Sequence, residues 1–232
     1  MANIAPTLGL ATLALTALGA SDSSYSQPCP PPSDSLVGSV SAANEYEVLR
    51  NGKIIGQHTV SFEGTQDRMT ITAETHMQVK ILFFTAYQYH YKSQEFWCGK
   101  QLQSVRTVVN DGGKANAVSA LREQNGYAID LNGTPSFVSG SLPPTNHWNI
   151  ELISSERLFN TITGQLNRVQ IVGVNAPQEP TNIRKYAIRG ELNIDTAYDQ
   201  AGNWMGMTFD HDDGSTIEFR CLNCNNTPDK PT

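Results

Sequence analysis

The chain has 232 residues, enough for one sizeable core, and only 16% of them are charged. Its formal net charge of −6 and its 16 scattered lysines and arginines exclude a basic surface that tracks phosphates. We therefore expect neither a nucleic-acid partner nor electrostatic docking on anionic lipid. The abundance of Gly, Ser, Thr and Asn favours short strands joined by many turns.

An uncharged apolar segment opens the chain, since residues 7–20 read TLGLATLALTALGA. Such a segment is too short to span a bilayer and is typical of a secretory signal peptide. We therefore expect residues 1–20 to be a signal peptide, the protein to be exported to the periplasm or beyond, and no stable membrane insertion. The first basic residue is Arg50, so either the chain starts inside a longer signal or its amino group alone supplies the positive charge. The alternative is a buried helix of the mature domain.

Residues 21–43 are rich in Pro and Ser and are expected to form a tether. Cys29 lies within it, too far beyond the apolar segment for lipid attachment. The other cysteines are Cys98, Cys221 and Cys224. The last two have the spacing of a redox motif, but they follow a predicted strand instead of opening a helix, and a zinc ribbon would need a second such pair. We predict two disulfides, with three connectivities open.

The folded domain is expected over residues 44–221, followed by a disordered tail over residues 222–232. Alternation of apolar and polar residues is clearest over residues 70–79, and Asn51-Gly52 is typical of a tight hairpin. The predicted strands cover residues 46–49, 54–62, 70–79, 87–97, 102–109, 115–121, 127–131, 168–174, 184–189, 192–198, 204–209 and 216–220.

One helix is predicted over residues 145–163. Pro143 and Pro144 precede a capping Thr145 or Asn146, and Gly164 can end the helix. The residues at helical spacing are Trp148, Leu152, Ser155 and Phe159. The predicted fold is mainly β, a strongly curved antiparallel sheet or half-barrel of about ten strands wrapped on one helix.

Several short motifs resemble an uncharacterised family of exported bacterial β proteins, over residues 45–220. They are Tyr46-Glu47-Val48, Arg50-Asn51-Gly52, Ile55-Gly56-Gln57-His58, Phe83-Phe84-Thr85-Ala86-Tyr87, Ser93-x-Glu95-x-Trp97, Asn110-Asp111-x-Gly113, Trp148-Asn149 and Tyr198-Asp199-x-x-Gly202-x-Trp204. The pattern is similar in turn to periplasmic lipoprotein carriers of the LolA and LolB type. That resemblance implies a curved sheet around a helix, with acyl chains held on the concave face. The cysteines and the Pro-rich tether depart from the family pattern.

An aromatic row marks one face of the strand over residues 87–97. Tyr87, Tyr89 and Tyr91 lead to Glu95 and Trp97. Tyrosine combines an apolar body with a polar tip, which suits the wall of an amphipathic pocket. Cross-strand packing of an ordinary sheet is the alternative. Arg106, on the returning strand, could face this row as an anion anchor or pair with Glu95.

His58 shares an apolar strand face with Val60 and Phe62, where it could act as a base, contact a ligand or lie hydrogen-bonded in the core. The other histidines do not combine with it at a metal-ligand spacing, so we expect no metal site and no cofactor. The sequence also lacks a nucleophile elbow and a glycine-rich phosphate loop, so no catalytic residue is assigned.

The leading hypothesis is a non-catalytic envelope protein that binds an apolar or amphipathic small molecule, such as a lipid or acyl group, in the concavity of its sheet. One alternative is an enzyme acting on an envelope or polymer-derived substrate through His58, Glu95 and Arg106. The other is a structural or interaction module with a filled interior, and the oligomeric state is open. The residues expected to line the pocket are His58, Val60, Phe62, Met77, Tyr87, Tyr89, Tyr91, Glu95, Arg106 and Trp148.

Overall fold

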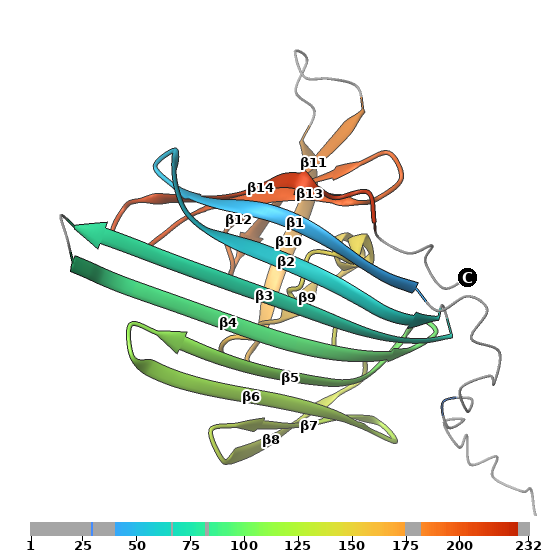
Figure 1. Ribbon diagram of the computed structural model, residues 1–232. Coiled ribbons are helices and arrows are strands. Elements are labelled where there is room, and N and C mark those ends of the chain that lie inside the picture. The colour runs from blue at the N-terminus through green and yellow to red at the C-terminus, as the bar shows by residue number, and fades with distance from the viewer. Residues whose placement is uncertain (1–28, 30–39, 66, 82–83, 175–181, 227–232) are drawn as a thin grey trace, which may run out of the picture.

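Fourteen antiparallel strands form one curved sheet in the computed structural model, which describes Cys29 and residues 40–65, 67–81, 84–174 and 182–226 (Figure 1). The strand order is β8-β7-β6-β5-β4-β3-β2-β1-β14-β13-β12-β11-β10-β9, so β8 and β9 are the edges and the sheet is not closed. The strands are β1 (Val40–Arg50), β2 (Lys53–Thr65), β3 (Arg68–Ile81), β4 (Phe84–Cys98), β5 (Gln101–Asp111), β6 (Lys114–Glu123), β7 (Gly126–Leu131), β8 (Thr134–Ser139), β9 (Arg157–Phe159), β10 (Leu166–Val174), β11 (Ile183–Gly190), β12 (Ile194–Asp199), β13 (Trp204–Asp210) and β14 (Thr216–Asn223).

The predicted alternation decides which face of the sheet is buried. On β3, Ile71, Ala73 and Thr75 are buried, as the sequence predicts. His76, which points to the opposite face of the strand, is exposed. The hairpin between β1 and β2 is also confirmed, because Asn51 and Gly52 both have positive φ, at 48° and 77°. The predicted signal peptide lies outside the described residues, and within them no helix is long and apolar enough to cross a membrane.

The predicted helix over residues 145–163 is wrong. The segment contains one 3₁₀ turn, η1 (Ile150–Ser154), and then the short strand β9. Asn149 caps the turn by accepting a hydrogen bond from the Glu151 amide at 3.1 Å, but Ser155 is already extended. The segment is dominated by Asn, Ser, Thr and Ile, which have low helix propensity, so contacts with the sheet override the helical spacing of its apolar residues.

The middle of the curved sheet is filled by side chains. Tyr46, Phe62 and Tyr198 are completely buried, and Trp204 is 2% exposed. The Tyr46 hydroxyl donates to the Trp204 carbonyl at 3.0 Å, which joins β1 to β13 over the intervening strand β14. The interior at this level is therefore a packed core.

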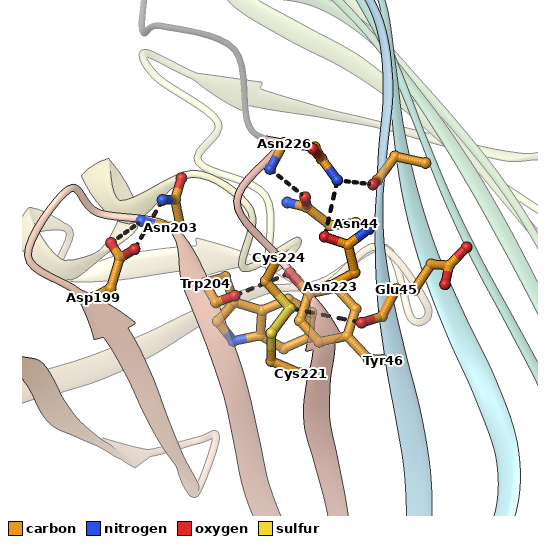
Figure 2. Close-up of a disulfide and its surroundings, with 11 residues drawn as sticks. Asn44, Glu45, Tyr46, Asp199, Asn203, Trp204, Cys221, Asn223, Cys224 and Asn226 are labelled. Atoms are coloured by element: carbon orange, nitrogen blue, oxygen red, sulfur yellow. Dashed lines mark hydrogen bonds between the residues drawn. A yellow bond between two sulfur atoms is a disulfide. The ribbon is translucent and has the colours of Figure 1, made fainter.

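Two disulfides, Cys29–Cys98 and Cys221–Cys224, are formed. The first joins the predicted tether to the end of β4. The second lies at the end of β14, where Cys224 is buried against β1 (Figure 2). Asn226 then donates to the Ala43 carbonyl at 2.7 Å, and the two strands it lies beside extend from Val40 in β1 and to Asn223 in β14.

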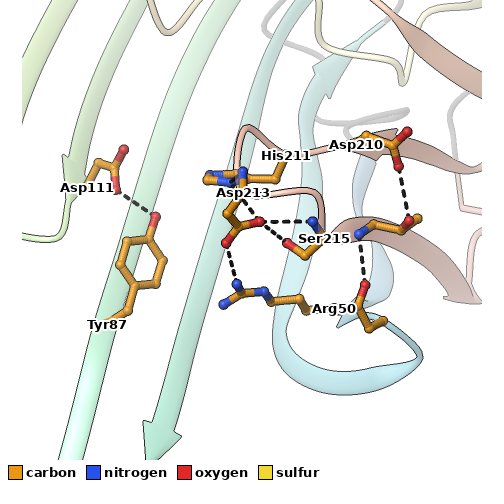
Figure 3. A network of polar contacts seen from close by, with 9 residues as sticks. Arg50, Tyr87, Asp111, Asp210, His211, Asp213 and Ser215 are labelled. Atoms are coloured by element: carbon orange, nitrogen blue, oxygen red, sulfur yellow. Dashed lines mark hydrogen bonds and ion pairs between the residues drawn. The ribbon is translucent and has the colours of Figure 1, made fainter.

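Polar contacts join the hairpins at the other end of these strands (Figure 3). Arg50, at the end of β1, pairs with Asp213 in the turn between β13 and β14. Asp213 also accepts from the Ser215 hydroxyl at 2.6 Å, and this bond, followed by the Ser215 amide, lowers the pKa of Asp213 to about 2. These contacts hold the turn beside the β1–β2 hairpin.

Candidate functional site

A buried carboxyl group lies at the centre of the concave face. Glu95 is on β4, pointing inward with Ser93 and Trp97, and none of its surface is exposed. Its Oε2 accepts hydrogen bonds from the indole Nε1 of Trp97 at 2.7 Å and of Trp148 at 3.1 Å. The Asn146 amide donates to its Oε1. A strand and the 140–164 segment therefore meet on one carboxyl group.

Burial raises the pKa of Glu95 to about 7, although its hydrogen bonds from Asn146, Trp97 and Trp148 favour the charged form. Both protonation states are consequently populated near neutral pH. Since two of the three donors, Asn146 and Trp148, lie on the 140–164 segment, the carboxyl group holds that segment against the sheet.

Further polar contacts extend this connection. The Tyr91 hydroxyl donates to Asn146 Oδ1 at 2.7 Å and shares a hydrogen bond with the Thr161 hydroxyl at 2.9 Å. Beside it, the Thr107 hydroxyl donates to Ser93 at 2.9 Å. Tyr91 and Glu95, predicted as pocket residues, are thus joined through Asn146 within the core.

His58 is a core residue. Its Nδ1 is 2.8 Å from the Thr75 hydroxyl, and its ring lies 5.3 Å from Phe219 and 5.6 Å from Trp204. Burial, helped by His147, lowers the pKa of His58 to about 3, so the imidazole is neutral at physiological pH. His147 is also buried, which lowers its pKa to about 4, and it stacks on Trp204 at 5.4 Å.

The expectation that Arg106 faces the aromatic row is wrong. Its neighbours Val105 and Thr107 are buried, so strand alternation places Arg106 on the outer, exposed face. His58 and Glu95 also belong to different rows of the sheet, because His58 pairs with Thr75 whereas Glu95 pairs with Ile71. The three side chains proposed for catalysis do not converge.

A cavity of about 820 Å³ opens beside the buried carboxyl group, between the 140–155 segment and the turns that follow β4 and β6. Its apolar wall combines strand residues with residues of the covering segment. They include Met69, Ile71, Trp97, Leu102, Tyr127, Leu142, Trp148 and Leu152. The Trp148 ring packs edge-on against the rings of Trp97 and Phe62, with ring centroids 5.7 Å and 5.8 Å apart.

Cationic groups lie on the wall of this cavity, at Arg122 and Lys100, against one acidic residue, Glu151. The Arg122 Nη2 reaches the Gln101 amide oxygen at 2.7 Å when that amide is oriented to accept. Its Nε is buried and has no hydrogen-bond partner within the described part of the chain. Arg122 and Lys100 place positive charge on a mostly apolar wall, where a carboxylate or phosphate group can accept charge-assisted hydrogen bonds.

A second cavity, of about 940 Å³, lies near the opposite ends of β3 and β4 and takes in Met77, Tyr87 and Tyr89. The Tyr87 hydroxyl donates to Asp111 at 2.6 Å (Figure 3). The predicted pocket residues are therefore divided. Trp148 lines the first cavity, and Met77, Tyr87 and Tyr89 line the second. The core holds the remaining inward residues, His58, Val60, Phe62, Tyr91 and Glu95.

Sequence reasoning missed Arg122, although a signal for it was present. Val118 and Ala120 are predicted strand residues on one face, and continued alternation places Arg122 on that same inward face. An arginine at an inward position of a half-buried strand indicates a partner or a ligand. Tyr127 on the next strand could be found in the same way.

A family model described as "Domain of unknown function (DUF6134)" matches residues 46–222. Among solved structures, the chain is similar to a crystal structure titled as a beta-barrel-like protein of domain of unknown function DUF1849 from Brucella abortus. The two share 14% identity at a TM-score of 0.59, with 82% of this chain and 98% of that chain covered, which shows a shared fold. No curated protein matches the chain.

Proposed function

Because the chain belongs to the DUF6134 family of domains of unknown function, its activity has to be inferred from its site, and we propose that it binds an amphipathic molecule with an anionic head, such as a fatty acid, in the cavity of about 820 Å³. The observation that carries the proposal is the combination of an apolar aromatic wall with the cationic side chains of Arg122 and Lys100 on the same cavity.

The shape and chemistry of the cavity suit such a ligand. Its volume falls within the range of about 300–1,000 Å³ that is usual for small-molecule sites. Met69, Leu102 and Leu142 offer apolar surface for an acyl chain, while Arg122 and Lys100 can receive a carboxylate or phosphate. The filled middle of the sheet limits how far a chain can enter, so we expect the ligand to remain at this end.

We further propose that the protein acts outside the cytoplasm, as the apolar N-terminal segment indicates. The two disulfides support this location, since such bonds persist in oxidising compartments.

The test is a calorimetric titration of the full chain, disulfides intact, with palmitate. We expect one palmitate per chain, and Arg122→Gln should weaken binding about tenfold or more because a charge-assisted hydrogen bond is lost. Arg106→Gln is the matched control, since it removes the same charge from the outer face, and it should leave the affinity unchanged. An absence of palmitate binding, or an equal loss in both variants, would contradict the proposal.

The geometry argues against one alternative, an enzyme, and favours the other, an interaction module. The enzymatic one loses its residues, because His58 and Glu95 are enclosed in the core and Arg106 is outside. An interaction module is favoured by the filled middle and by exposed apolar residues on β6 and β8, Leu121 at 62% and Phe137 at 50%. A chain that binds no amphiphile in the titration above would be assigned to this second class.

A further inference from the structure

Two histidines and a glutamate lie together on the outer face of the sheet, away from the proposed ligand cavity. Glu74 and His76 are on β3, and His90 on β4 is the direct cross-strand partner of His76. Thr75, which lies between Glu74 and His76, and Tyr91, which follows His90, both point into the core. Strand alternation therefore makes the side chains of Glu74, His76 and His90 project outward. The sheet register thus brings together residues that the sequence separates.

The nitrogen atoms of both imidazoles point at the same carboxylate oxygen. His76 Nε2 and His90 Nε2 are each 3.0 Å from Glu74 Oε1, and their rings stack with centroids 4.2 Å apart. In a tetrahedral zinc site, ligand bonds of about 2.0–2.1 Å place neighbouring ligand atoms about 3.3 Å apart. The two N···O separations are already close to that value, and all three atoms lie within 4.8 Å of one another.

The surroundings leave room for an ion. The side chains of His76 and His90 are 64% and 47% exposed, so small rotations can bring their two Nε2 atoms closer together. Solvent can fill a remaining coordination position. Lys92 approaches the other oxygen, Oε2, at 3.6 Å and leaves Oε1 to the histidines.

From this geometry we infer that Glu74, His76 and His90 bind a divalent transition-metal ion of the Zn²⁺ type. Two imidazoles with one carboxylate are ligands preferred by Zn²⁺, Co²⁺, Ni²⁺ and Cu²⁺, whereas Ca²⁺ and Mg²⁺ prefer sites built from oxygen alone. Three protein ligands leave at least one position open for water or for a donor group from another molecule. The expectation of no metal site rested on sequence spacing, which does not register cross-strand neighbours.

The inference is tested by titrating the metal-free full chain with Zn²⁺ and Co²⁺, following Zn²⁺ by competition with a chromophoric chelator and Co²⁺ by its visible absorption. We expect one ion per chain and at least tenfold weaker binding in His76→Ala, His90→Ala and Glu74→Gln. His211→Ala, which removes another exposed histidine, is the matched control and should bind as the wild type does.

Lys92→Met provides an independent test, because removing a positive charge beside Glu74 should tighten Zn²⁺ binding several-fold. Circular dichroism spectra that match the wild type would show that the exposed substitutions leave the fold intact. The inference is overturned if the wild type binds no stoichiometric Zn²⁺, or if the three ligand variants bind it as tightly as the control.

Discussion

Glu95 shows how a single buried residue makes stability depend on pH. Its pKa is about 7 in the folded protein against an ordinary value of 4.5, so the folded chain holds a proton that the unfolded chain has lost between these values. Its contribution is therefore fully present below about pH 4.5 and is lost as the pH rises through 7. Replacement by glutamine keeps the shape of the group but removes the titration.

We expect the wild type to lose free energy of unfolding relative to Glu95→Gln as the pH rises from 4.5 to 7.5, by about 3 kcal/mol at most. Urea denaturation of both proteins at several pH values measures the difference. A difference that does not change with pH would show that the carboxyl group titrates normally in the folded state.

His58 has the opposite pH dependence. Its pKa falls from 6.5 to about 3 on burial, so its neutral form is the folded one, and acid favours the unfolded chain, which binds the proton more readily. The associated stability is complete above about pH 6.5 and is lost as the pH falls towards 3.

His58→Phe should accordingly reduce the loss of stability between pH 6.5 and 4, while costing some stability at every pH because the Thr75 hydroxyl loses its partner. Denaturation at pH 4, 5 and 6.5 tests this. His211→Phe is the control, since that histidine is exposed; an equal effect in both variants would rule out a special role for His58.

At the same scale, the sequence predicts which side chains point inward far better than which of them meet. Alternation correctly places Glu95 and Trp97 on the buried face of β4. It cannot supply Asn146, because the path of an irregular segment depends on packing. The pairing of His76 with His90 was missed for a related reason: the connecting run Ile81-Leu82-Phe83-Phe84 contains no turn residue that would fix the register.

At the scale of elements, Asn146 helps to attach the 140–164 segment to the sheet, because it contacts Tyr91, Ser93 and Glu95. Asn146→Ala would remove one hydrogen bond from each of these buried groups, which keep their other partners, Thr161, Thr107 and the two indoles. We expect it to lower the free energy of unfolding by about 1–3 kcal/mol. Asn110→Ala, at an exposed position near the end of β5, should cost less. Equal losses in urea denaturation would show that the Asn146 hydrogen bonds do not stabilise the segment.

Close approach of strands makes a second test at this scale. Gly206 on β13 has a φ of +139°, and a Cβ built there would lie 2.1 Å from the Phe219 carbonyl oxygen. Gly206→Ala should therefore destabilise the protein by about 1–3 kcal/mol. Gly173→Ala on β10 is the control, because its Cβ would meet nothing within 4 Å. Similar melting temperatures for the two variants would contradict the strand geometry.

The strands were predicted correctly where alternating apolar and polar residues are bounded by turn residues, and were missed where either signal is lacking. The strands up to residue 131 and the hairpin at Asn51-Gly52 follow the expected pattern. The short strands β8 and β9 were missed, since Thr134–Ser139 is exposed along most of its length and Arg157–Phe159 has three residues. Trp148, Leu152 and Phe159 are all buried, but they lie on a mostly irregular segment and not on a helix.

At the scale of the whole molecule, the sheet is curved and filled in its middle, with cavities towards its ends. The leading hypothesis from the sequence places the ligand in the concavity of the sheet, with a filled interior as an alternative. Large aromatic side chains from the nearby strands β2, β1 and β13, namely Phe62, Tyr46 and Trp204, fill the middle of the sheet. The ligand site that we propose therefore lies at one end of the molecule.

The chain's three tryptophans allow this claim to be tested directly. Trp97 and Trp148 line the cavity of about 820 Å³, whereas Trp204 lies in the filled middle. The measurement is quenching of tryptophan fluorescence by palmitate brominated along its chain, in the wild type, Trp204→Phe and Trp148→Phe. The account predicts saturable quenching that persists in Trp204→Phe and is reduced in Trp148→Phe. Quenching that disappears with Trp204, or no saturable quenching in the wild type, would contradict it.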